Sequence, residues 1–475
     1  MAKRTKKGRR GGTHTIEISF SDERATSFGG MVLEHRLACR LGLWSSLDKR
    51  LPARAGRYSW LSIIQSAVAG LLTGSRGTFA TEEVRQDEGL LEILDLDGAP
   101  EEATFWRCLD ALGGMAESGL LGATQGEWTR RILQRFSRRS LLECDGFFPV
   151  FADGSLLEGS ARREGTKHIP HKGRGLLWTT IFAGPLVAAQ ALAREGEGEE
   201  AVVRRLLPQV RREVLAPLKL DKKALLLADS LHGDEPTLRV VEDEEMAYIV
   251  GAGSLKETQR VLEERAAWEW HELGADRKRG GSDSAVCQCW IQCGSWPEKR
   301  LLVGRRVTRE GEMFPTYYGV VTNLTPEALG AGDTVEFAQK VWRLYDAKGR
   351  MELSYKELLS DLGLHHPPCQ EHRRNAGFYA LATLAHTVGM AVKLFGQRAD
   401  DERRAQRAQA KRHGVPQRIR VKPRRGMRLW RVRRRLFALP ARVRRHARRL
   451  RLEFLGVSAD IQAQFHGWYH AISFL

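Results

Sequence analysis

One short apolar run constrains the fold of this chain more than any other feature. Residues 224–229 read ALLLAD, five consecutive apolar residues followed by an aspartate. A strand that is apolar on both faces is typical of a sheet covered by helices on both sides. The run therefore predicts an α/β core with Asp229 at the carboxyl end of a buried strand. Ligands of open α/β sheets bind at such strand ends.

Other strands and helices surround this run. The segments 149–153, 175–195 and 246–253 are β-branched and aromatic runs bounded by Gly, Pro and Asp, a pattern typical of strands. Residues 199–218 form a helical stretch between them. The alternation predicts a mixed α/β sheet.

Composition and hydrophobic pattern divide the chain into five parts. These are a mainly helical region (1–140), the first part of the α/β core (141–253), an antiparallel β-rich insertion (254–324), the second part of the core (325–400) and an arginine-rich region (401–475). Two helices around a turn at Asp97-Gly98 fit a helix-turn-helix or an ordinary helical hairpin.

Charge narrows the range of partners. Lys and Arg number 76 and Asp and Glu 58, so the net charge is +18, which favours a polyanionic partner. The arginine-rich region is expected to face nucleic acid, or else to serve folding or localisation as a basic tail. No run approaches the roughly 20 apolar residues that cross a bilayer, so we expect a soluble, intracellular protein with no membrane partner.

Seven cysteines are too few for a disulfide framework in a chain of 475 residues. Cys287, Cys289 and Cys293 share the parity of Ile291, which would place all four on one face of a strand. We interpret these cysteines as core residues, because no fourth zinc ligand sits at a recognisable spacing.

Two aspartates are candidates for chemistry. Asp153 follows the apolar run PVFA and precedes Gly154, which allows a sharp turn, so its carboxylate would project from the sheet edge. We prefer Asp153 to its competitor Asp145 because of the apolar strand before it. His232 and Asp234 follow Asp229 closely. They would either assist it or be ordinary polar residues of a loop.

A predicted helix at 344–363 carries the third acidic candidate, Glu352. Tyr345, Lys348 and Lys356 lie seven and four residues away from it, so the four residues share one stripe of the helix. Alone, this pattern would more often be an exposed row of ion pairs. Together with two strand-end aspartates it suits two divalent metal ions and phosphodiester chemistry.

From about residue 85 to 395, these features resemble the DDE transposases of bacterial insertion sequences. The resemblance rests on FADGS, LLLADS, YYGVVTNL, the 345–356 helix and RRNAGFYALATLAH. Such enzymes place a basic residue three after a tyrosine and the glutamate four beyond it, here Tyr345, Lys348 and Glu352. Lys348 stands where arginine is typical, and Leu359 stands where a lysine is expected, so Lys356 or Arg350 would complete the phosphate clamp.

The resemblance implies a ribonuclease H-like core interrupted by the β insertion. Asp153, Asp229 and Glu352 would hold two Mg²⁺ ions, with Mn²⁺ as a substitute, and Tyr345, Lys348, Arg350 and Lys356 would bind the substrate. The helical N-terminal region would bind DNA.

It further implies cut-and-paste transposition by a homodimer on double-stranded DNA, at terminal inverted repeats and a target, in a bacterial cytoplasm and associated with the nucleoid. Hairpin ends would form in relatives with this insertion, and Trp290 or Trp296 would hold a flipped base or pack in the core. The alternatives are a domesticated, non-catalytic DNA-binding protein and a structure-specific nuclease.

Overall fold

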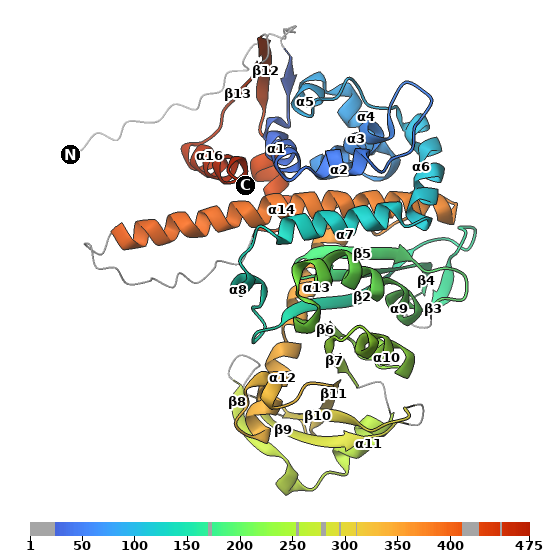
Figure 1. The fold of residues 1–475 in the computed structure, drawn as a ribbon, viewed down its shortest axis with the longest axis vertical. Helices are drawn as coiled ribbons and strands as arrows, with labels where there is room; N and C mark the ends of the chain where they lie inside the picture. The colour runs from blue at the N-terminus through green and yellow to red at the C-terminus, as the bar shows by residue number, and fades with distance from the viewer. Residues whose placement is uncertain are drawn as a thin grey trace, which may run out of the picture.

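The computed structural model describes residues 24–169, 173–252, 256–276, 282–293, 296–309, 311–410, 427–446 and 449–475. Figure 1 shows a helical tier, a long helix that crosses the middle of the molecule, and a tier built on a sheet. The arginines of 411–426, part of the basic region, lie outside the described residues.

A mixed sheet of ten strands organises the lower tier. Its order is β3-β4-β2-β6-β7-β11-β10-β9-β8, and β5 pairs with β4. The strands are β2 (Phe148–Glu158), β3 (Lys167–Ile169), β4 (Gly173–Ala183), β5 (Leu186–Leu192), β6 (Ala224–Ala228), β7 (Ala247–Gly251), β8 (His271–Asp276), β9 (Ser282–Ile291), β10 (Arg300–Thr308) and β11 (Thr316–Thr322).

Strand directions confirm the predicted mixed α/β fold. β2, β4 and β5 pair antiparallel, whereas β2 with β6 and β6 with β7 pair parallel. This arrangement agrees with the ribonuclease H-like core that the resemblance implies. β6 is fully buried along its length, as its continuous apolar sequence predicts.

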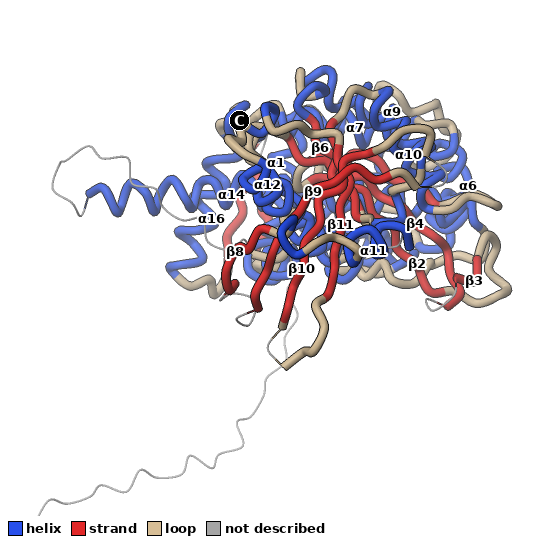
Figure 2. Tube along the Cα trace, turned by 90° about the horizontal axis from the view of Figure 1, so that it is seen from below, coloured by secondary structure: helices blue, strands red, loops and turns tan. Residues whose placement is uncertain are grey.

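The β-rich insertion is antiparallel, as predicted, and it extends the core sheet. β11 pairs antiparallel with β7, with Val321 opposite Val250, and β10, β9 and β8 follow in order. In the view of Figure 2 the strands spread from the centre of the molecule, with helices above and to both sides of them. Helices that pack on the sheet include α9 (Glu199–Val210), α10 (Glu235–Asp243), α11 (Lys256–Glu263), α12 (Thr334–Tyr345) and α13 (Lys348–Lys356).

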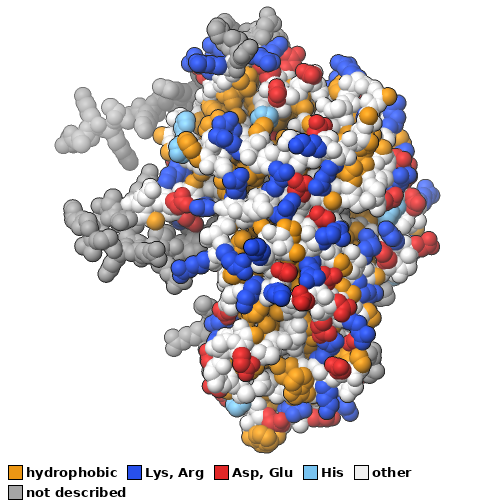
Figure 3. All heavy atoms as spheres, in the orientation of Figure 1, with side chains coloured by type: hydrophobic (Ala, Val, Ile, Leu, Met, Phe, Trp, Pro, Cys, Tyr) orange, Lys and Arg blue, Asp and Glu red, His pale blue; other side chains and the backbone are white. Residues whose placement is uncertain are grey.

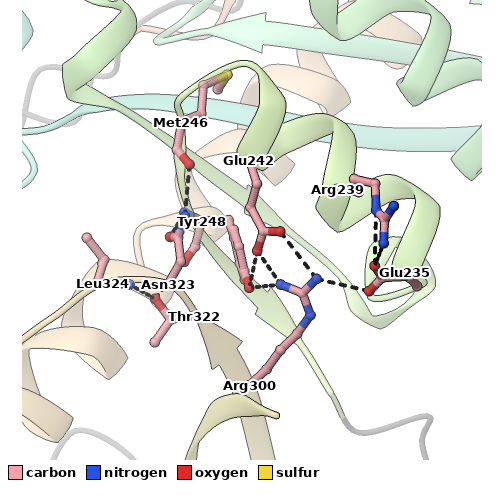
Figure 4. Close-up of polar contacts among 9 residues, drawn as sticks. All are labelled: Glu235, Arg239, Glu242, Met246, Tyr248, Arg300, Thr322, Asn323 and Leu324. Carbon is pink, nitrogen blue, oxygen red and sulfur yellow. Dashed lines mark hydrogen bonds and ion pairs between the residues drawn. The ribbon is translucent and has the colours of Figure 1, made fainter. Parts of the chain in front are cut away.

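Polar contacts fasten the insertion to the core (Figure 4). Arg300 of β10 forms ion pairs with Glu235, at 2.9 Å, and with Glu242, both on α10. Its guanidinium also donates to the Tyr248 hydroxyl of β7 at 2.7 Å. The Arg300 side chain is only 10% exposed, so its charge needs these partners. The insertion is therefore held against the core by a buried ionic group as well as by strand pairing.

Helix α14 (His372–Ala410) is the long central helix. Residues 372–406 are long and apolar enough to span a membrane by length and composition, but their most apolar window is 94% buried inside the fold. Its close neighbour is α6: a Cβ added at Gly377 would lie 2.7 Å from the Gly113 backbone nitrogen. The two glycines allow the helix backbones to touch, so α14 is the core helix that its apolar sequence predicts.

The helical tier comes from both ends of the chain. Its first part contains β1 (Ala25–Thr26), α1 (Val32–Leu41), α2 (Leu43–Asp48), α3 (Trp60–Thr73), α4 (Ala80–Gln86), α5 (Glu88–Ile93), α6 (Glu102–Glu117), α7 (Leu120–Leu133) and α8 (Arg138–Leu141). Its last part contains α15 (Leu429–Val432), β12 (Ala441–His446), β13 (Arg449–Phe454) and α16 (Ala459–Ser473). β1, β12 and β13 form one small sheet, which joins the two parts.

The described part of the arginine-rich region is folded, and several of its arginines are structural. Arg433 donates to the carbonyl oxygens of Leu71, Leu72 and Asp361 at 2.7 to 3.1 Å. Trp468 of α16 is fully buried. On the face shown in Figure 3, Lys and Arg side chains alternate with Asp and Glu. The region thus contributes to folding, one of the two roles that its sequence left open.

The cysteines of the insertion are core residues, as their spacing predicts. Cys287, Cys289 and Cys293 are 2%, 8% and 3% exposed, and burial raises the pKa of each thiol. Trp296 is also buried, and the Arg300 guanidinium lies over its ring at 5.7 Å. Trp290 of β9 is different, because 64% of its surface is exposed.

Candidate active site

Asp153 lies where β2 separates from β6. Parallel pairing between the two strands runs from Phe148 to Phe151, and β2 then continues to Glu158 beside β4. The expectation that the strand turns at Gly154 is therefore wrong. Asp153 still lies just beyond the carboxyl end of the parallel pair, where its carboxyl is affected by the charge of Asp229 at the end of β6.

Gly154 has another structural reason. A Cβ at this position would lie 2.4 Å from the carboxyl carbon of Glu199, the first residue of α9. Any larger residue would collide with that carboxylate. Gly154 thus lets Glu199 approach the strand directly beside Asp153.

Asp229 lies at the end of β6, as the sequence predicts. It caps the short turn 230–232, and its Oδ1 accepts a hydrogen bond from the Leu231 backbone N–H at 3.1 Å. Its side chain is 41% exposed. The carboxylate is thereby oriented by its own loop and remains open to solvent.

Charge couples the two aspartates. The pKa of the Asp153 carboxyl is raised to about 6, first by burial and then by the negative charges of Glu199 and Asp229, while the positive charge of Lys348 opposes the shift. Elements distant in sequence, β2, β6, α9 and α13, therefore carry charges close enough to affect the Asp153 carboxyl. The structure brings together Asp153, Asp229 and Lys348, three of the predicted site residues.

A buried histidine connects two of the carboxylates. His232 is fully buried, and its Nε2 lies 3.1 Å from Glu199 Oε1 and 3.7 Å from Asp229 Oδ1. Burial lowers the pKa of this imidazole, but the hydrogen bond to Glu199 and the surrounding negative charges outweigh burial and raise it. The reading of His232 as an ordinary polar residue of a loop is therefore wrong. Asp234, in contrast, caps α10 and pairs with Arg204 at 2.7 Å.

The Tyr345 hydroxyl lies close to the backbone of Asp229. A Cβ added at Gly251 would lie 2.9 Å from the Tyr345 hydroxyl and 3.4 Å from the Asp229 carbonyl carbon. Burial, followed by the negative charge of Asp229 and of Asp346, raises the pKa of this phenol to about 12. The hydroxyl is thus a neutral donor close to Asp229.

The predicted single helix is interrupted. α12 ends at Tyr345 and α13 begins at Lys348. Between them the chain tightens, because the backbone N–H groups of Ala347 and Arg350 bond to carbonyls only three residues earlier. The stripe that was expected to join Tyr345, Lys348 and Glu352 on one continuous helix is therefore broken after its first member.

Glu352 is exposed on α13. It follows Lys348 by one turn and precedes Tyr355 by three residues, so it lies on the same face as both. Tyr355 is buried, and the pKa of its phenol is raised by burial first and then by the charges of Asp153 and Glu199. Among the described residues no three acidic, His or Cys side chains already form a metal-binding group. The convergence of Glu352 on the two aspartates stays a prediction.

The remaining candidates point elsewhere or to solvent. Arg350 forms an ion pair with Glu143 at 2.8 Å, and Lys356 is exposed. Asp145 has a left-handed backbone, φ 49°, and pairs with Arg343. A turn with its own cation explains Asp145 without a role in the acidic cluster.

Sequence reasoning missed Glu199 and Tyr355. Glu199 lies in an acidic run with Glu195, Glu197 and Glu200, and nothing local distinguishes it from them. The one available signal was its position as the first residue of a helix that follows an antiparallel hairpin. Its burial depends on His232 and Gly154, which are distant in sequence.

Comparison with known proteins gives one match that bears on this site. Residues 181–412 match the family model described as Transposase DDE domain group 1. The matched domain covers a little under half of the chain and includes Asp229 and Glu352, but it begins after Asp153.

The other comparisons add little. Comparison with curated protein sequences yields no match. Among solved structures, the chain is similar to a piggyBac transposase in a synaptic complex with hairpin DNA, at 11% identity and a TM-score of 0.33, with 79% of each chain covered. Similarity at this level carries no argument about the site.

Proposed function

We propose that this chain is a DNA transposase that cleaves strands at transposon ends and transfers them into target DNA. The observation that carries the proposal is the coupling of Asp153 with Asp229 at the ends of the parallel strands β2 and β6. The match of residues 181–412 to a transposase DDE domain supports the same reading. The proposal extends to cut-and-paste transposition of a bacterial insertion sequence.

The residues of this site fit divalent metal ions. Asp153, Asp229 and Glu352 offer carboxylate oxygens, the donors that Mg²⁺ takes, and Mn²⁺ accepts the same donors. Burial first, and then the negative charges of Glu199 and Asp229, raise the pKa of Asp153, and a cation at this carboxyl would neutralise that charge. We propose that these three carboxylates hold two Mg²⁺ ions. When bound, such ions activate a water or 3′-hydroxyl nucleophile and stabilise the leaving oxygen.

The other residues hold the substrate in this scheme. The Tyr345 hydroxyl beside Asp229 is placed to donate to a phosphate oxygen, and the Lys348 ammonium would offset phosphate charge near Asp153. Lys356 is exposed and free to contact DNA from the next turn, whereas Arg350 would have to leave Glu143 to do so. Trp290 is exposed enough to stack on a flipped base, which would suit a route through hairpin ends.

The partners are inferred from charge and family. A net charge of +18 suits double-stranded DNA, both terminal inverted repeats and target. We propose that a homodimer assembles on that DNA in the cytoplasm, at the nucleoid. The helical tier and the exposed arginines of the C-terminal region would make most phosphate contacts, with steep salt dependence.

The test is cleavage of a labelled duplex that carries the DNA flanking the gene, in Mg²⁺ and in Mn²⁺, for the full chain and for Asp229→Asn. We expect metal-dependent nicking at a defined end and joining to a second duplex, both absent in Asp229→Asn, with unchanged binding in a gel shift. Cutting without joining would indicate a nuclease. Binding without cutting in either metal would indicate the non-catalytic alternative.

A further inference from the structure

The pair Glu199 and His232 is the most enclosed polar group near the candidate site. Glu199 is 4% exposed and His232 is fully buried, and they share a 3.1 Å hydrogen bond. A buried carboxylate and imidazole are costly to desolvate, and that cost is offset only where each meets a partner. The sequence pointed to His232 only as a neighbour that would assist Asp229, and it did not distinguish Glu199 at all.

The pair lies beside both strand-end aspartates. Its imidazole Nε2 lies 3.7 Å from Asp229 Oδ1, and its carboxyl group fills the space that a side chain at Gly154 would take, directly beside Asp153. The pair therefore lies between Asp229 and the part of β2 that carries Asp153 and Gly154. Asp229 is 41% exposed and its Oδ1 accepts one backbone hydrogen bond, so the imidazole adds a second constraint on its carboxylate.

We propose that Glu199 and His232 are positioning residues: Glu199 fixes the imidazole, and the imidazole fixes the Asp229 carboxylate relative to Asp153. This inference rests on the proposed metal site and deepens it. Groups that orient metal-binding side chains typically change metal affinity by 10- to 100-fold when they are removed. The hydrogen-bonding reach of residue 199, rather than its charge, is what the site requires.

Two amide variants of Glu199 distinguish the effect of its hydrogen bond from the effect of its charge. Glu199→Gln and Glu199→Asn both remove the negative charge and keep a polar side chain, but only glutamine places its oxygen where Oε1 accepts from His232 Nε2. The probe is Mn²⁺ binding to the full-length protein without DNA, followed by electron paramagnetic resonance of free Mn²⁺. Thermal unfolding without metal confirms that each variant is folded at the temperature used.

We expect Glu199→Gln to bind Mn²⁺ within about threefold of the wild type and Glu199→Asn about tenfold more weakly. Cleavage by Glu199→Asn should recover at saturating Mn²⁺, because the metal-binding carboxylates remain. His232→Phe, which keeps an aromatic ring but no hydrogen bond, should match Glu199→Asn.

Each other outcome has a distinct meaning. Equal affinity for both amide variants and the wild type, with Asp229→Asn impaired, would overturn the positioning role and leave the metal site intact. Equal loss in both amide variants would show that the charge of Glu199 acts on the metal directly, which also overturns the positioning role. Wild-type affinity in Asp229→Asn would instead defeat the proposed metal site itself.

Discussion

Two acidic groups near α13 differ in how their charge is balanced. Beyond α13, the Glu357 carboxylate is 1% exposed, and both of its oxygens lie 2.7 Å from the Lys393 ammonium. Asp153 is only partly buried, and it lies within reach of the charge of Lys348, the first residue of α13. Glu199 and Asp229 add negative charge that Lys348 offsets only in part.

Burial raises the pKa of both carboxyl groups, but the next cause differs. For Glu357 it is the positive charge of Lys393, which lowers the pKa, whereas for Asp153 it is the negative charge of Glu199, which raises it further. A buried acid with its own cation is complete within the fold. An acid with negative neighbours is stabilised either by taking up a proton or by a cation from outside, and such groups concentrate at functional sites.

We expect the largest effect from breaking the buried ion pair between Glu357 and Lys393. Lys393→Met leaves Glu357 buried without its cation, and we expect the free energy of unfolding to fall by about 3–5 kcal/mol. Urea denaturation of the metal-free protein measures this. The double variant with Glu357→Leu is the matched control and should regain most of the loss. A cost under about 1 kcal/mol would mean that water reaches Glu357, so the contrast with Asp153 would fail.

Removing the Glu352 carboxylate from the proposed metal site should lower the rate of strand cleavage. For Glu352→Ala we expect strand cleavage to fall by about 10²- to 10³-fold, as for loss of other groups that stabilise transition-state charge. DNA binding should persist, because Glu352 carries no positive charge. Tyr345→Phe and Lys356→Ala should cost less, since they would position phosphates without holding metal. Wild-type cleavage by Glu352→Ala would exclude it from the site.

Local sequence was sufficient where burial follows one strand or one helix. ALLLAD placed Asp229 at a strand end because five apolar residues in a row leave few other folds. The apolar sequence of α14 likewise predicted a core helix. In both cases neighbours in sequence are also neighbours in the structure.

Local sequence failed where a contact joins distant segments. The role of Gly154 was misread as a turn because the carboxylate that fills its space belongs to α9, and Glu199 was missed for the same reason. The break after Tyr345 had no strong signal, since Asp346 and Ala347 are both tolerated in helices. The structural share of the arginine-rich region depends on carbonyls of α3, more than 350 residues away.

We expect a smaller change in stability from replacing Asp153, the acid whose neighbours are mainly negative. Asp153→Asn removes a charge that the fold disfavours, so we expect the metal-free protein to gain about 1–3 kcal/mol in unfolding free energy at pH 7. Because the folded-state pKa is raised to about 6, the gain should shrink as pH falls through that value. Denaturation at pH 7 and pH 5 tests both points, and the same variant should lose Mn²⁺ binding. Destabilisation at pH 7 would show that Asp153 already has a sufficient cation.

The smallest expected effect applies the same distinction to cations. Arg433 is engaged with three carbonyl oxygens, whereas Arg445 on β12 is exposed. Arg445→Gln should therefore weaken DNA binding slightly and reduce the salt slope of log K by about 0.9, the value for one phosphate contact. Arg433→Gln should lower stability and leave the slope unchanged.

Fluorescence anisotropy between 50 and 200 mM salt measures both slopes, at a temperature where both variants remain folded. Point variants are needed here, because truncation after Arg403 would also remove Trp468, which packs against α14 at Gly396. An unchanged slope in Arg445→Gln would place the β12 and β13 hairpin outside the DNA path. Exposed arginines of this region would then need another explanation, and the basic surface would have to be sought on the N-terminal helices α1 to α6.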